Sequence, residues 1–144
     1  MKYWILLVFR LLSGLDKRIE RCDKVIERIA LSPFGDTMAQ YEEILSQMNK
    51  KNKLINLRVM SERIKSALAT EDYFLLCKYA SGVPVKELSL SFAVGKGALY
   101  KRLNKIFALA ERTLQRDGFT EEELEREYAE FPFIITQLVR LKRC

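Results

Sequence analysis

One stretch of the sequence carries positive charge alone. No acidic residue lies between Glu87 and Glu111, and the cations in that window are Lys96, Lys101, Arg102 and Lys105. Lysine and arginine side chains grouped in this way can contact phosphate oxygens, which supply the sequence-independent part of nucleic-acid binding. An amide lies among them at Asn104, and an asparagine amide can pair with adenine. These residue types favour binding to a nucleic acid.

Helical spacing predicts which of these side chains share a face. Leu99, Leu103 and Ile106 recur in steps of three and four, which predicts the buried face of a helix near residues 96–107. The opposite face then carries Lys96, Gly97, Tyr100, Lys101 and Asn104. Lys96 and Lys101 could reach guanine acceptors or phosphates from there.

The candidate contacts on this surface differ in kind. We expect Lys101 and Asn104 to face bases, whereas Lys105 and Lys86, the latter from the preceding helix, face phosphates. Gly97 permits a close approach of the backbone to the ligand.

Two further side chains in the same helix have alternative interpretations. Tyr100 either lies against a thymine methyl group or a phosphate, or forms an edge of the hydrophobic core. Arg102 either braces the motif or touches the nucleic-acid backbone, unless it is a simple surface cation.

The elements around this helix predict a helix-turn-helix. Val85–Phe92 favours a short helix, and Ala93, Val94 and Gly95 form a tight connection to the next one. Val94 fills the inside of the corner while the small residues beside it keep the corner narrow. The two helices can then cross steeply, and the second can enter a major groove.

A third helix is predicted immediately upstream. Thr70 is expected to cap it, with Glu71 and Asp72 placed over its positive end. The helical segment is expected over Tyr73–Ser81, and Gly82 is expected to end it in the left-handed conformation.

The segment Phe74–Leu103 resembles the region-4 helix-turn-helix of bacterial sigma-70-family proteins. The positions that match the family pattern are Leu75, Tyr79, Gly82, Lys86, Glu87, Leu88, Leu99, Arg102 and Leu103. The departures are Ser89, Ala93, Gly95 and Ala98, where the family usually has alanine, glycine, a serine cap and threonine. The layout is similar to small phage and prophage transcription activators that carry such a module alone. The resemblance implies DNA binding, with RNA polymerase as a candidate protein partner.

Two long helices are predicted before this module. Apolar residues recur with helical spacing from Trp4 to Ile29, and the segment Ser32–Gly35 ends that helix. A second helix begins near Asp36, and its stripe consists of Met38, Tyr41, Leu45, Met48, Asn52, Ile55 and Val59. Either the stripes of this hairpin bury each other, or the long stripe joins two copies into a homodimer whose register Asn52 sets.

The C-terminal segment is expected to be helical and acidic. Phe119, Thr120, Glu123 and Leu124 predict a helix start, Pro132 interrupts that helix, and a helical segment follows over Phe133–Leu141. Residues 111–144 carry 6 cations and 8 acids, so we expect them to point away from DNA. Six of these acids form a cluster that a helix start explains better than a metal site, namely Glu121, Glu122, Glu123, Glu125, Glu127 and Glu130.

Composition limits the function further. The chain has 144 residues, 49% of them apolar, which suffices for about one domain and excludes a multidomain enzyme. It lacks histidine, the commonest general base and metal ligand, so we expect no enzyme, no metal and no cofactor. Cys22, Cys77 and Cys144 give no disulfide framework, which favours the cytoplasm. The apolar run Met1–Leu12 is too short for a membrane span.

We therefore expect an all-α protein with a hairpin over residues 1–69, a helix-turn-helix module over 70–116 and a C-terminal helical segment over 117–144. The expected function is sequence-specific binding of double-stranded DNA by a cytoplasmic, dimeric transcription regulator of phage or bacterial type. The alternatives are a small terminase subunit that recognises DNA and a helical adaptor that does not bind DNA.

Overall fold

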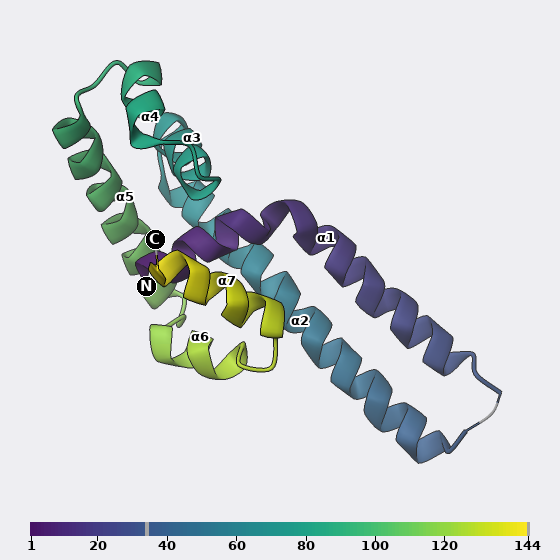
Figure 1. The fold of residues 1–144 in the computed structure, drawn as a ribbon. Helices are drawn as coiled ribbons and strands as arrows, with labels where there is room; N and C mark the ends of the chain where they lie inside the picture. The colour runs from purple at the N-terminus through teal and green to yellow at the C-terminus, as the bar shows by residue number, and fades with distance from the viewer. Residues whose placement is uncertain (34, 144) are drawn as a thin grey trace. The chain divides into compact units, whose positions relative to one another are not determined.

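The chain is helical throughout the part that the structure describes. The computed structural model describes residues 1–33 and 35–143, and these contain no strand. In chain order the helices are α1 (Lys2–Ala30), α2 (Thr37–Ala67), α3 (Thr70–Ala80), α4 (Val85–Ser91), α5 (Lys96–Arg116), α6 (Glu121–Glu127) and α7 (Pro132–Arg143) (Figure 1). The expected all-α class and element order are confirmed. Phe34, expected in the break after the first helix, and Cys144, one of the three cysteines, lie outside the described residues.

The contacts divide the chain into two compact units. Unit 1 comprises Met1–Arg10 and Met60–Cys144, and unit 2 comprises Leu11–Val59. The long helices α1 and α2 each contribute to both units. The domain boundaries expected after residues 69 and 116 do not coincide with this division. They remain a prediction about which segments of the chain fold independently.

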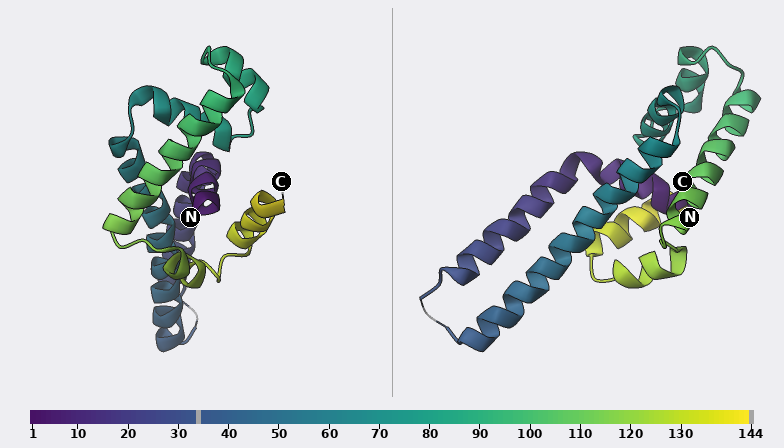
Figure 2. Two further views of the ribbon diagram at one scale, coloured as in Figure 1. Left: turned by 90° about the vertical axis from the view of Figure 1, so that its left-hand side faces the viewer. Right: turned by 180° about the vertical axis from the view of Figure 1, so that it is seen from behind.

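Unit 2 is an antiparallel hairpin of the later part of α1 and most of α2 (Figure 2). The carboxylate of Asp36 accepts a 2.9 Å hydrogen bond from the backbone N–H of Met38 and thereby caps the start of α2. Ion pairs between the two arms include Lys51–Asp23 at 2.6 Å and Arg58–Asp16 at 2.7 Å.

The apolar stripe expected on the second helix is not buried in this hairpin. Met38 is 65% exposed, Tyr41 is 59% exposed, and Asn52 is exposed as well. A different flank of α2 packs in the hairpin, and on it Leu54 is only 3% exposed. The interpretation in which the two stripes bury each other is therefore wrong for α2.

The apolar run near the start of the chain belongs to the core of unit 1. Trp4 and Ile5 are fully buried, and the Trp4 ring lies 5.9 Å from that of Tyr128. Arg10 Nε donates a 2.6 Å hydrogen bond to the carbonyl of Ala80 at the end of α3. Across the described ranges, we find no helix with the length and apolar character that crossing a membrane would require.

Three helix ends test the expected caps. Thr70 is wrong as a cap, because Ala69 takes the extended conformation before α3 and Thr70 already lies inside the helix. Gly82 has a φ of +94°, which confirms the left-handed end of the upstream helix. Thr120 Oγ1 accepts a 3.3 Å hydrogen bond from the N–H of Glu123, which confirms the cap of α6.

Candidate nucleic-acid interface

Helices α3, α4 and α5 of unit 1 pack against one another around buried leucines. Leu88 of α4 and Leu99 of α5 are fully buried, and Leu103 and Ile106 continue the buried face along α5. The face of α5 that the spacing predicts as core is therefore confirmed. The rotation of α5 about its axis is fixed by these contacts, and so is the set of side chains that points outward.

The outward side of α5 is polar and accessible. The predicted site residues that are exposed are Lys86, Lys96, Gly97, Tyr100, Lys101, Asn104 and Lys105. All but Lys86 lie on α5, so the structure brings six of them onto one helix, whereas Lys86 stands on α4. Tyr100 is 48% exposed, which leaves half of its surface accessible to a ligand.

Ser89 closes the turn between α4 and α5. Its hydroxyl donates a 2.7 Å hydrogen bond to the carbonyl of Val94, and the N–H of Val94 donates a 3.1 Å bond to the carbonyl of Ser89. Within this loop Ala93 has a φ of +54°. That left-handed conformation costs a residue with a Cβ about 1–2 kcal/mol. The two bonds of Ser89 thus hold a backbone conformation that glycine would adopt more readily.

Gly95 occupies the N-cap position of α5. Its backbone is extended, with φ −69° and ψ 159°, and no side chain accepts a hydrogen bond from the first turn of the helix. The expected loss of a serine cap is confirmed. From this start α5 continues to Arg116, well beyond the 96–107 segment that the sequence predicts.

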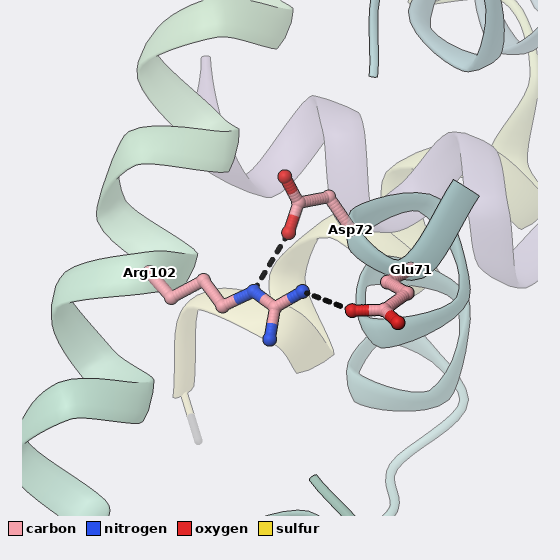
Figure 3. Close-up of polar contacts among 3 residues, drawn as sticks. All are labelled: Glu71, Asp72 and Arg102. Atoms are coloured by element: carbon pink, nitrogen blue, oxygen red, sulfur yellow. Dashed lines mark hydrogen bonds and ion pairs between the residues drawn. The ribbon is translucent and has the colours of Figure 1, made fainter. Parts of the chain in front are cut away.

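Arg102 differs from the other predicted site residues because carboxylates hold its guanidinium (Figure 3). Its Nε donates a 2.7 Å hydrogen bond to Oδ1 of Asp72, and its Nη2 lies 3.5 Å from Oε2 of Glu71. The hydrogen bond to Asp72 is the main cause that raises the pKa of Arg102 above its ordinary value. The guanidinium also lies 5.5 Å from the ring centre of Phe92. Of the alternatives for Arg102, bracing the motif fits this geometry.

Sequence reasoning missed an open cavity beside this ion pair. It has a volume of about 550 Å³ and is lined by Glu71, Phe74, Lys78, Ser91, Phe92 and Arg102. The lining comes from α3, the C-terminal end of α4 and α5, so no local sequence pattern could reveal it. Arg102 is the one residue that belongs both to this cavity and to the predicted site.

Comparisons with protein-family models, with curated proteins and with solved structures find no match to this chain.

Proposed function

We propose that this protein binds double-stranded DNA through α5 and regulates transcription as a homodimer in the cytoplasm. The observation that carries the proposal is the two-sided character of α5. One side is buried core, and the other presents exposed cations and an amide with no acidic residue between Glu87 and Glu111.

The shape of the element suits the major groove. An α-helix with its side chains is about 10–12 Å across, and the major groove of B-DNA is about 12 Å wide. In helix-turn-helix proteins the N-terminal part of the second helix contacts base edges. Lys96, Tyr100 and Lys101 lie in that part of α5, and Asn104 follows one turn later.

The proposed contacts to DNA are of two chemical kinds. Lys101 and Asn104 supply donors for base edges, whereas Lys105 and Lys86 supply positive charge for phosphates. Arg102 acts as a positioning residue, since its charge is already paired with Asp72. Gly97 places no side chain between the backbone and the ligand, and no other protein atom lies within 4 Å of the position that a Cβ would take there.

The regulatory role rests on the resemblance of Phe74–Leu103 to sigma region 4. RNA polymerase is accordingly the protein partner that we propose. The contrasting function is a helical adaptor, whose exposed lysines would only be a solvated surface.

The test is a titration of the full-length protein with a labelled random-sequence duplex at several salt concentrations. We expect affinity to fall steeply with salt, because each phosphate contact releases a counterion. The double variant Lys86→Ala/Lys105→Ala should reduce the slope of log affinity against log salt by up to about 1.8, at ~0.9 for each phosphate contact. Lys17→Ala/Arg21→Ala, which removes two exposed charges from unit 2, is the matched control and should leave the slope unchanged. An adaptor would show no steep salt-dependent binding.

A further inference from the structure

Unit 2 exposes an apolar stripe along α2. The stripe consists of Met38, Tyr41, Leu45, Met48, Asn52, Ile55 and Val59, which follow one another in alternating steps of three and four residues. Met38, Tyr41, Leu45 and Met48 are between 65% and 46% exposed. The spacing is the a/d repeat of a coiled coil, with Met38, Leu45, Asn52 and Val59 at a positions.

Helix α1 does not cover this stripe because it contacts another flank of α2. That flank contains Ile44, Gln47 and Leu54, which are half-buried or buried. It also contains Lys51 and Arg58, whose ion pairs reach across to α1. The helix therefore has two flanks suited to packing, and the hairpin uses one of them.

We infer that the stripe pairs with the same stripe of a second copy, as a parallel two-stranded coiled coil. The inference specifies the interface of the homodimer, and to that extent it rests on the proposed function. It does not depend on DNA binding.

Asn52 favours a second copy, and it favours the parallel orientation. In a parallel pair each a position meets the same a position of the partner helix, so the two Asn52 amides can hydrogen-bond to each other. In an antiparallel pair an a position meets a d position, so Asn52 would meet Met48 or Tyr41 and the two Asn52 amides could not pair with each other. A single asparagine at an a position is the device that sets register and strand number in such pairs.

Charge and area are also compatible with self-association. The cations beside the stripe, Lys51 and Arg58, are paired with Asp23 and Asp16 of the same chain, so two copies would not repel each other there. Burying the exposed parts of the stripe on two copies removes on the order of 1,000 Å² from water, which is about the lower limit for a specific interface. We therefore expect a reversible dimer.

Sedimentation equilibrium of the full-length protein tests the surface. Leu45→Glu should raise the dimer dissociation constant at least about tenfold, because each dimer would bury two carboxylates. Ser46→Glu is the matched control, since it adds the same charge one position away from the stripe and should leave the dissociation constant unchanged. Circular dichroism of each variant verifies that the helices remain folded.

The orientation is tested by cross-linking. In a background with all three native cysteines replaced by serine, Asn52→Cys should form a disulfide-linked dimer under mild oxidation, whereas Ser46→Cys should not. A wild-type monomer at high micromolar concentration, or a dimer that Leu45→Glu does not weaken, would overturn the interface. If Leu45→Glu weakens the dimer but Asn52→Cys forms no cross-link, the parallel pairing is overturned. Salt-dependent binding to random duplex is measured separately on the Leu45→Glu variant, so loss of the dimer and loss of DNA binding remain distinguishable.

Discussion

Arg102 and Asp72 lie 30 residues apart in the chain, and Nε of Arg102 donates a 2.7 Å hydrogen bond to Oδ1 of Asp72. The bond joins α5 to the first turn of α3. It therefore helps to fix the helix that we propose to enter the groove, and it removes one cation from the set that is free to contact phosphates.

Removing this pair should destabilise the fold. We expect Arg102→Ala to lower the free energy of unfolding by about 1 kcal/mol, since both side chains are partly exposed and solvent screens the charges. A double-mutant cycle with Asp72→Ala, measured by urea denaturation, should give a coupling energy of about 0.5–1 kcal/mol. A coupling energy of zero would contradict this role. If Arg102→Ala also reduced the slope of log affinity for DNA against log salt, Arg102 would instead contact a phosphate.

The turn before α5 offers a stabilising substitution. Ala93 has a φ of +54°, so Ala93→Gly should relieve backbone strain and raise the free energy of unfolding by up to about 1 kcal/mol, after the entropic cost of glycine. Ala108 is an exposed residue in the middle of α5, and Ala108→Gly should cost about 1 kcal/mol. Urea midpoints of the two variants should therefore shift in opposite directions. If both glycine variants lowered the free energy of unfolding by the same amount, the backbone at Ala93 would hold no strain.

The buried face of α5 is tested by a large-to-small substitution. Leu99 is fully buried, so Leu99→Ala should cost about 2–5 kcal/mol through lost burial and the cavity left behind. Leu90 is 77% exposed and serves as the control, because Leu90→Ala should change stability by less than about 0.5 kcal/mol. An unchanged melting curve for Leu99→Ala would mean that another face of α5 packs in the core.

A pH dependence follows from Tyr73. Burial, with a hydrogen bond to the side chain of Cys77, raises the pKa of Tyr73 to about 12 from its ordinary value of 10.0. The unfolded chain loses this proton at lower pH than the folded chain, so the contribution of Tyr73 is intact below pH 10 and declines as the pH rises from about 10 to about 12.

The free energy of unfolding, measured by urea denaturation across this range, should therefore decline less in Tyr73→Phe than in the wild type. Tyr41→Phe is the control, since Tyr41 is 59% exposed in unit 2. Equal declines in the wild type and in Tyr73→Phe would show that the Tyr73 hydroxyl titrates alike in the folded and unfolded states.

The fold class and the buried face of α5 could be predicted from the sequence because both depend on local spacing. Leu99, Leu103 and Ile106 lie one helical turn apart, and their burial follows from that period alone. Gly82 was predictable for a similar reason, because few residues other than glycine adopt a positive φ readily.

The predictions that the sequence could not make correctly depend on tertiary contacts. The stripe from Met38 to Val59 has core-like spacing, but α2 has packing residues on two flanks and the period does not say which flank meets α1. The bond between Arg102 and Asp72 joins segments that are 30 residues apart, so the sequence alone could not decide between the alternatives for Arg102. Thr70 was misplaced by one residue, which is within the usual uncertainty of a helix end.

Two substitutions separate base reading from nonspecific attraction. Lys105→Ala should weaken binding to all sequences alike and reduce the slope of log affinity against log salt by ~0.9. Asn104→Ala should lower affinity for the preferred site by ~1–3 kcal/mol and leave binding to random duplex nearly unchanged.

Selection from a randomised duplex library, carried out with the wild-type protein and with Asn104→Ala, tests the central claim most directly. We expect the wild-type protein to enrich a defined motif, and we expect Asn104→Ala to enrich the same motif with one base position relaxed. An unchanged motif together with a uniform loss of affinity would contradict direct reading by α5 and leave its exposed face as an electrostatic surface alone.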